Sequence, residues 1–335
     1  MTTIAVDAMG GDYAPQEIVH GAVLAANENG IKVQLVGPEK IIKAELDKYL
    51  VAKYLPIDII DAEDVIEMSE TQPANAVRRK TNSSIVVAMK QVAEGKASGV
   101  VAAGSTGAAA AAALLTLKRI DGIERPCIAA VIPTHIKHVV LTDAGANLDS
   151  TPENLRQNAI MGIALSKALF KSENPKVGLL NVGEEPGKGN ALVKEAYQLL
   201  ESDPNISFVG NVEGRGVTEG ICDICVCDGF VGNIFLKTAE GVAKMVSALL
   251  REELNRDLKS QLGALISKDS FYRLKKRIDY SEYGGAQLLG VNGVCVIAHG
   301  SSKHIAIKNA IRVAKDAANA NIIELIKGMI KVHIS

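Results

Sequence analysis

Residues 5–15 read AVDAMGGDYAP, and this stretch contains the turn on which the fold depends. A short apolar run, typical of a buried strand, stops at Gly10 and Gly11, and Pro15 then opens a helical pattern. Glycine permits a tight turn from strand to helix, and it also lets the backbone approach another group closely. From the sequence alone, both explanations of the two glycines remain open.

The same succession of strand and helix recurs along the chain. The strand-like runs are TIAVDA, KVQLVG, PIDIID, SGVVAAG, CIAAVI, HVVLTDA, KVGLLNV, ISFVGNV, DICVCDG and VCVIAHG. Helical patterns fill the gaps at about 15–28, 82–94, 106–118, 152–170, 190–201, 230–278 and 302–331. Because the strand runs are continuously apolar, they indicate parallel strands that helices cover on both faces. The predicted fold is an α/β, doubly wound, three-layer αβα sandwich with a mostly parallel sheet.

Length and composition agree with this fold. A chain of 335 residues, 47% hydrophobic and 22% charged, has ample material for a core. No internal repeat and no linker rich in Pro, Gly or Ser suggests a domain boundary. We therefore expect one α/β domain over residues 1–335, with a helical outgrowth at 240–280.

Several functional classes are disfavoured. A formal net charge of −1 argues against a nucleic-acid partner, which normally meets a basic face. The N-terminus lacks a signal peptide pattern and no apolar run approaches a membrane span, so a cytoplasmic protein is expected. Five cysteines indicate reduced thiols. Cys222, Cys225 and Cys227 are close enough for a metal site, but no fourth ligand lies near them in the sequence, which favours core packing.

Five glycine-rich loops follow predicted strands. They are AMGGDYAP, AAGSTGAAAA, NVGEEPGKGNA, VCDGFVGN and IAHGSSKH. In doubly wound sheets, ligands bind beyond the carboxyl ends of the strands, where such loops lead into helix N-termini. Backbone N–H groups of glycine loops and helix dipoles both favour an anion, and phosphate is the simplest candidate.

The familiar nucleotide and metal motifs do not fit these loops. GEEPGKG has one residue too few between its outer glycines for a P-loop, and Gly189 stands where a Ser or Thr is required. GRGVTEG has one residue too many for G-x-G-x-x-G. No G-x-S-x-G elbow and no histidine or carboxylate ligand spacing appears. We therefore expect neither a metal nor a cofactor.

Eight loops, in order, resemble those of the phosphate acyltransferases of bacterial phospholipid synthesis. They are AVDAMGGDYAP, AAGSTGA, LTDAGAN, LLNVGEEPGKGN, GNVEGRG, VCDGFVGNIFLKTAEG, IDYSEYGGAQLLGV and AHGSS, and the likeness spans nearly the whole chain. The resemblance implies transfer of a fatty acyl group from acyl carrier protein to inorganic phosphate. The acyl phosphate product then serves a membrane glycerol-3-phosphate acyltransferase. A fold like that of phosphate acetyltransferases and isocitrate dehydrogenases, a homodimer and peripheral attachment to anionic membranes are implied as well.

Two other functions share these loops. A phosphotransacetylase-like enzyme would use coenzyme A thioesters at the same phosphate site. A non-catalytic scaffold would hold acyl carrier protein or acyl phosphate without turnover. A preference for the carrier protein over a short-chain coenzyme A thioester distinguishes the two enzymes. Turnover with phosphate distinguishes either enzyme from a scaffold.

The resemblance implies Lys188 and Asn233 as the catalytic pair. Phosphate is already a nucleophile and a thioester has a good leaving group, so the site needs orientation and oxyanion donors. Lys188 would steer phosphate, and the Asn233 amide would donate to the carbonyl oxygen or hold phosphate. The residues expected to bind substrate or phosphate are Asp7, Gly10, Gly11, Asp12, Gly104, Ser105, Thr106, Gly107, Gly187, Gly189, Asp228, Gly229, Gly232, His299, Gly300 and Ser301.

Several of these residues have ordinary structural alternatives. Asn233 is a candidate to cap the helix that runs through IFLKTAEG, and Ser301 or Ser302 to cap the last helix. Asp7 and Asp12 are candidates to close Asx turns.

Other positions carry less information. Lys188 alone would suit a solvated loop, and His299 a strand end. The family commonly has histidine, asparagine and aspartate where this chain has Tyr13, Ser105 and Gly216, so no firm role follows for these three.

The outgrowth has two apolar patterns. Leu250, Leu254, Leu258 and Leu262 form a stripe that a second subunit or the chain's own sheet would cover. The segment LGALISKDSFYRLKKRI, 262–278, combines apolar side chains with a basic set, as a membrane-surface helix does. Its apolar residues are Leu262, Leu265, Ile266, Phe271, Leu274 and Ile278, and its basic ones are Lys268, Arg273, Lys275, Lys276 and Arg277. The alternative is a helical hairpin with a solvated basic face.

Overall fold

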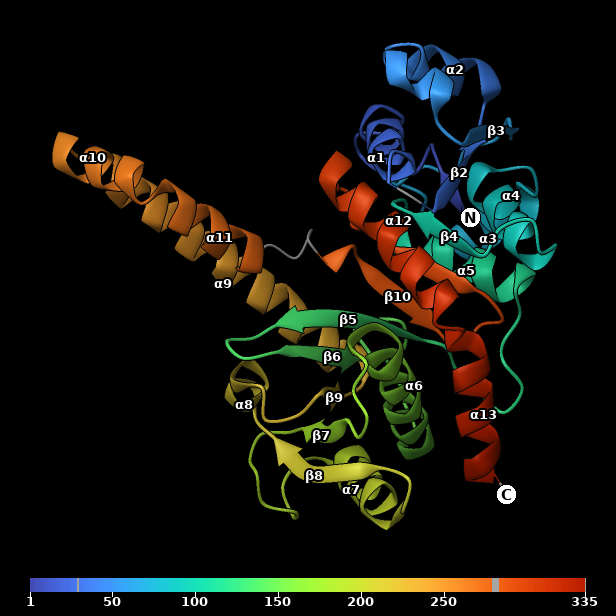
Figure 1. Ribbon diagram of the computed structural model, residues 1–335. Coiled ribbons are helices and arrows are strands. Elements are labelled where there is room, and N and C mark those ends of the chain that lie inside the picture. Colours follow the sequence, from blue (N-terminus) through green and yellow to red (C-terminus); the bar gives the residue numbers. More distant parts are fainter. Residues whose placement is uncertain (29, 279–282, 335) are drawn as a thin grey trace.

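The computed structural model describes residues 1–28, 30–278 and 283–334 (Figure 1). Two predicted features fall partly outside this range, since residues 279–282 belong to IDYSEYGGAQLLGV and residues 279–280 also belong to the expected outgrowth. The side chains of Lys275 and Ile278 are likewise outside the described part.

A single mixed sheet runs through the described part of the molecule. Its strands are β1 (Thr2–Asp7), β2 (Ile31–Gly37), β3 (Ile57–Asp61), β4 (Gly99–Ala102), β5 (Cys127–Pro133), β6 (His138–Thr142), β7 (Lys176–Leu180), β8 (Ser207–Val212), β9 (Ile224–Val226), β10 (Ala286–Leu289) and β11 (Val294–Ile297). Their spatial order is β3-β2-β1-β4-β11-β10-β5-β6-β9-β7-β8. β10 is antiparallel to both β11 and β5, and β5 is antiparallel to β6, whereas the other pairings are parallel.

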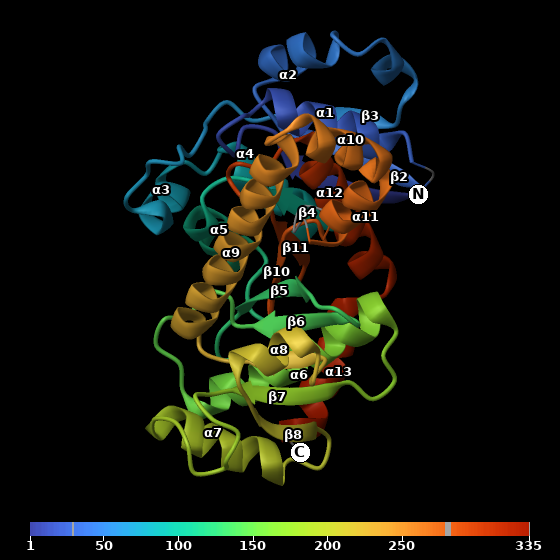
Figure 2. The same cartoon turned by 90° about the vertical axis from the view of Figure 1, so that its left-hand side faces the viewer.

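Helices cover both faces of this sheet (Figures 1 and 2). They are α1 (Gln16–Ala26), α2 (Glu39–Leu46), α3 (Pro73–Arg79), α4 (Ser84–Ala93), α5 (Thr106–Thr116), α6 (Pro152–Phe170), α7 (Ala191–Ser202), α8 (Gly214–Glu219), α9 (Gly229–Asn255), α10 (Leu258–Ile266), α11 (Lys268–Ile278), α12 (His304–Asn319) and α13 (Ile322–Ile334), with a 3₁₀ turn at Leu50–Tyr54. Ile4 and Val6 of β1 pack in the core with α1, α6 and α12, whereas Ala5 faces the core with α4 and α5. The alternation of neighbouring residues between two cores confirms the predicted three-layer sandwich.

The ten predicted strand runs all form strands. β10 was missed, because AQLL follows two glycines and is interrupted by Gln287, so that no continuous apolar run marks it. The predicted helix 230–278 is three helices, since Asp257 caps α10 by accepting a hydrogen bond from the Ser260 N–H at 2.8 Å. The predicted helix 302–331 divides where Asn321 turns the chain with φ of +52°.

The cysteines and the outgrowth can also be compared with expectation. All five cysteines are free and buried, which confirms core packing for Cys222, Cys225 and Cys227. α9 to α11 project from the sheet, α10 packs against α9, and α11 leads back toward the sheet (Figure 1). Leu258 is 84% exposed, so the alternative in which this stripe packs on its own sheet is wrong. Within the residues described, no helix has both the length and the apolar character to span a bilayer.

Candidate active site

Three glycine loops pack against one another at the carboxyl ends of β1, β4 and β11. These strands are neighbours in the sheet, so their following loops lie side by side. A Cβ on Gly10 would lie 2.7 Å from the Gly104 nitrogen, and Gly11, with φ of +108°, would place one 3.1 Å from the Gly300 oxygen. The Asp12 N–H donates to the same Gly300 oxygen at 2.9 Å. The glycines in AVDAMGGDYAP are therefore required for close contact between loops as well as for turning the chain.

Asp7 lies beneath this contact and is buried. Its carboxylate accepts the Met9 N–H at 3.2 Å, which closes an Asx turn. Burial raises the pKa of Asp7, while hydrogen bonds from Ser84, Met9 and Gly10 oppose the rise. Asp7 therefore supports the first glycine loop from inside the protein.

The loop that leads into α5 provides the N-cap of this helix and one side chain that faces a cavity. The Ser105 hydroxyl accepts the Ala108 N–H at 3.4 Å and caps α5, and Thr106 lines the cavity described below. A Cβ on Gly107 would lie 2.9 Å from the ring of Pro73, so this glycine allows α5 to approach α3.

On the other half of the sheet, the loop after β6 is held by Asp143. Its buried carboxylate accepts backbone N–H groups of Ile128, Gly145, Ala146 and Asn147 at 2.8–3.0 Å. Burial raises the pKa of Asp143, and these donors counteract that rise. The result is a fixed loop against which α9 can begin.

α9 begins in direct contact with this loop. A Cβ on Gly232 would lie 1.9 Å from the Asp143 oxygen, and one on Gly229 would lie 2.5 Å from the Asn147 oxygen. No larger residue fits at either position without moving the helix. The glycines of VCDGFVGN thus fix where the first turns of α9 lie.

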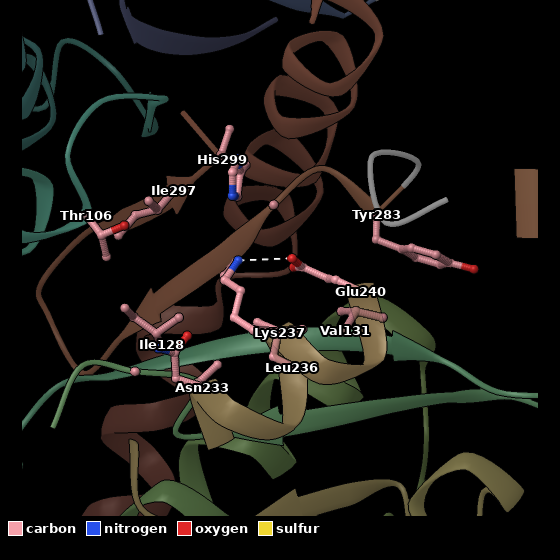
Figure 3. Close-up of a pocket in the computed structure, with 16 residues that line it drawn as sticks. Thr106, Ile128, Val131, Asn233, Leu236, Lys237, Glu240, Tyr283, Ile297 and His299 are labelled. Carbon is pink, nitrogen blue, oxygen red and sulfur yellow. Dashed lines mark hydrogen bonds and ion pairs between the residues drawn. The ribbon is translucent and has the colours of Figure 1, made fainter. Parts of the chain in front are cut away.

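At the start of α9, one residue caps the helix and a different residue faces a cavity. Asp228 caps the helix by accepting the N–H groups of Phe230 and Val231 at 3.0 and 2.9 Å. The alternative role of Asn233 as the cap is therefore wrong. Asn233 lies one turn further on, and its side chain points into a cavity (Figure 3).

This cavity has a volume of about 270 Å³ and lies between α9 and the central strands β5, β10 and β11. α9 contributes a row of residues one turn apart, and the loop after β6 and the start of α5 complete the lining (Figure 3). The lining includes Thr106, Ile128, Val131, Ala144, Gly145, Asn233, Leu236, Lys237, Glu240, Tyr283, Ile297 and His299. A mostly apolar wall thus surrounds a few polar groups, as in many small-molecule sites.

Lys237 and His299 approach the same space from opposite walls (Figure 3). The Lys237 ammonium lies 3.0 Å from the Glu240 carboxylate. The Ser301 N–H donates to Nδ1 of His299 at 3.2 Å, which assigns the ring proton of neutral His299 to Nε2. Burial and then the charge of Lys237 lower the pKa of His299. The cavity is therefore lined by the Lys237 ammonium and the Asn233 amide on α9, with the His299 imidazole on the opposite wall.

Ser301 does not cap α12. Its hydroxyl lies 2.8 Å from Nδ1 of His299, and Lys303 occupies the N-cap position without a side-chain cap bond. The capping alternative for Ser301 and Ser302 is therefore wrong. The Glu17 carboxylate instead accepts the His304 N–H at 2.7 Å.

Lys188 is not among the residues that line this cavity. Its side chain is 54% exposed, and its ammonium lies 4.0 Å from Glu185. Gly187 has open space around it, whereas Gly189 turns with φ of +94° beside Asn181. The structure thus places Lys188 on an open loop, apart from the cavity that holds Asn233.

Gly189 lines a second cavity of about 610 Å³, on the other side of α9. Val231, Ile234, Phe235 and Thr238 face this second cavity, whereas Asn233, Leu236, Lys237 and Glu240 face the first. Opposite faces of one helix therefore line two separate cavities.

Sequence reasoning missed Lys237 and Glu240. They follow Asn233 at spacings of four and seven, which place them on its face of a helix. That spacing was available in the predicted helix 230–278, but charged residues on helices are usually solvated.

Comparison with known proteins identifies the family of this chain. A family model described as "Fatty acid synthesis protein" matches residues 2–325. A phosphate acyltransferase from Gloeothece citriformis is 51% identical over 98% of this chain and 94% of its own length. One from Pelotomaculum thermopropionicum is 49% identical over 98% of this chain and 95% of its own.

Solved structures share the fold at much lower identity. A phosphotransacetylase from Streptococcus pyogenes has a TM-score of 0.63 at 18% identity, covering 96% of this chain and 94% of its own. A branched-chain phosphotransacylase from Enterococcus faecalis has a TM-score of 0.57 at 15% identity, covering 95% and 99%. These likenesses confirm the predicted fold.

The family model and the relatives at half identity both extend over nearly the whole chain and confirm the predicted resemblance. The chain therefore belongs to the phosphate acyltransferase family of fatty acid synthesis proteins.

Proposed function

We propose that this protein transfers a fatty acyl group from acyl carrier protein to inorganic phosphate, releasing acyl phosphate and the carrier thiol. The observation that carries the proposal is the cavity on α9, where the Asn233 amide and the Lys237 ammonium meet an apolar wall. The phosphate acyltransferase names of the relatives support the reaction class.

The chemistry needs few protein groups. A phosphate oxygen attacks the thioester carbonyl carbon, an oxyanion develops, and the C–S bond then breaks with release of the thiolate. The Asn233 amide donates to the oxyanion, a contribution worth about 2.7–4 kcal/mol for one such donor. The apolar wall formed by Ile128, Val131 and Leu236 accommodates the acyl carbons next to the thioester.

Two lysines are proposed to neutralise phosphate. Lys237 stands beside Asn233 and is held by Glu240. Lys188 is proposed as the second on the family resemblance; its ammonium is exposed and lies 4.0 Å from Glu185, on the loop whose Gly189 lines the second cavity. A flexible ammonium acts on phosphate as a point charge and needs no fixed geometry.

The proposed partners are acyl carrier protein, a second copy of this chain in a homodimer, and an anionic membrane. A membrane glycerol-3-phosphate acyltransferase is proposed to consume the product. An apolar row along the outgrowth supports the contacts with a second subunit and a bilayer. Its exposed members include Val242, Met245, Val246, Leu249, Leu258, Leu262, Leu265 and Ile266. Such a row is larger than isolated surface residues explain.

The test uses purified protein with acyl carrier protein charged with a long-chain acyl group. Release of free carrier thiol is followed with and without phosphate, in the presence of EDTA. We expect release that requires phosphate, survives the chelator and is far faster than with a short-chain coenzyme A thioester. Thiol release independent of phosphate would contradict the transfer, and faster reaction of the coenzyme A thioester would contradict the donor.

A further inference from the structure

A cluster of two histidines and one glutamate lies outside the cavity, where α1 meets the start of α12. Glu17 and His20 are three residues apart on one face of α1, and His304 is the first residue of α12. One potential ligand atom from each residue lies within 4.8 Å of the other two. The sequence gives no sign of this group, because His304 is 287 residues from Glu17.

Within the cluster, the His304 ring is held by a hydrogen bond, whereas the His20 ring is held by stacking. Nδ1 of His304 lies 2.7 Å from the Glu17 carboxylate. The His20 ring stacks on the His304 ring at 4.2 Å, with 21° between their planes. For the ring nitrogens of His20, no hydrogen bond is found to any residue that the structure describes. A partly buried imidazole thus stands next to an imidazole–carboxylate pair with its lone pair unused.

We propose that Glu17, His20 and His304 form a binding site for a divalent metal ion of the zinc class. Two imidazoles and one carboxylate are a donor set that Zn²⁺ uses with a water molecule in the fourth position. Imidazole also suits Co²⁺, Ni²⁺ and Cu²⁺, whereas Mg²⁺ and Ca²⁺ prefer all-oxygen sites. The Glu17 and His304 side chains are 28% and 32% exposed, so an ion can reach them from solvent.

Metal binding requires the deprotonated carboxylate of Glu17 and an unprotonated ring nitrogen on each of the two histidines.

Binding requires small movements. The ion replaces the proton between Glu17 and His304 and releases it to solvent. Metal–ligand bonds of about 2.0–2.2 Å in a tetrahedron separate the ligand atoms by about 3.3–3.5 Å. The 2.7 Å distance between Nδ1 of His304 and the Glu17 carboxylate must therefore lengthen, and the coordinating nitrogen of His20 must move closer to both. The two rings must also turn from their stacked arrangement so that their in-plane lone pairs converge.

The proposed metal site lies between two helices that each follow one of the glycine loops. α1 follows the loop of Gly10 and Gly11, and α12 follows the loop of Gly300, whose oxygen already accepts the Asp12 N–H. An ion held by both helices ties these two loops together. The role is therefore to stabilise the loops, and it is separate from the chemical step proposed above.

The experiment measures Zn²⁺ binding to protein without a histidine tag, in a buffer free of phosphate, with Co²⁺ absorption as a second probe. We expect one ion per chain in the wild type and a rise in melting temperature at saturating Zn²⁺. His20→Gln and His304→Gln should each weaken binding by at least the roughly 10–100-fold typical of losing an outer-shell partner. The matched control is His135→Gln, which removes an exposed histidine elsewhere and should bind like the wild type.

His20→Gln is the decisive variant, because the His20 ring has no hydrogen bond to the described part of the chain and its loss should leave folding intact without metal. Wild-type protein that binds no stoichiometric Zn²⁺ would overturn the proposal. Equal binding in the wild type, His20→Gln and His304→Gln would also overturn it, since the ion would then lie elsewhere. The five cysteines are all buried in the native protein, so they do not compete for the ion.

Discussion

Asn233 and Asp228 are five residues apart on the chain, and the structure gives them different tasks. Asn233 faces the cavity and Asp228 caps α9. We expect Asn233→Ala to lower kcat by about 10²–10³-fold with little change in melting temperature. Asp228→Ala should instead lower the free energy of unfolding by about 1 kcal/mol. Steady-state kinetics and thermal melting of both variants check this, and near-native turnover in Asn233→Ala would remove Asn233 from the mechanism.

The two lysines differ in how firmly they are held, and their substitution separates their contributions. We expect Lys237→Ala and Lys188→Ala each to raise the KM for phosphate and to slow turnover, because each removes a positive charge from the phosphate. If each lysine acts on the same transition state as Asn233, combining its variant with Asn233→Ala should cost less than the product of the single losses. Phosphate titrations at saturating acyl donor measure this. A native KM and kcat in either variant would exclude that lysine.

At the scale of residues, the sequence predicted the glycines of the site but not all of its charged and histidine side chains. The glycines were recognisable, because only glycine fits where Gly10 meets Gly104 and Gly232 meets Asp143. Lys237 was not, since a lysine on a helix is ordinarily solvated. His304 was not, because only the fold brings it to Glu17.

At the scale of elements, the long apolar runs gave the strands and the parallel sheet correctly. The failures occur where an element is short or interrupted. The apolar run of β10 is interrupted by Gln287, and the break between α9 and α10 depends on one cap, that of Asp257. Propensity summed over a window does not resolve features of that size.

The exposed end of α10 supports a specific prediction for the outgrowth. Leu265 and Ile266 are 68% and 79% exposed at the end of α10, next to the basic α11. We expect Leu265→Glu combined with Ile266→Glu to abolish cosedimentation with anionic liposomes, while activity on soluble substrate remains. Gln261→Glu adds a charge without removing apolar area and should still bind. Unchanged liposome binding in the double variant would contradict the membrane contact.

At the scale of the whole molecule, the exposed face of α9 predicts a dimer. Met245 and Leu249 are 55% and 54% exposed and lie one turn apart. Light scattering at micromolar concentration should give twice the chain mass, and Met245→Glu combined with Leu249→Glu should give a monomer. Ser247→Glu places a charge on the opposite face of the helix and should remain dimeric. A monomeric wild type would exclude the dimer.

The order of strands in the sheet has a consequence for how the chain is made. β10 and β11 lie between β4 and β5, yet they come from residues 286–297, after every other strand. Until the ribosome has added them, β4 and β5 each present an edge without its final neighbour, and the two halves of the sheet are not joined. Open strand edges recruit other chains, so the nascent protein depends on protection from aggregation until synthesis is nearly complete.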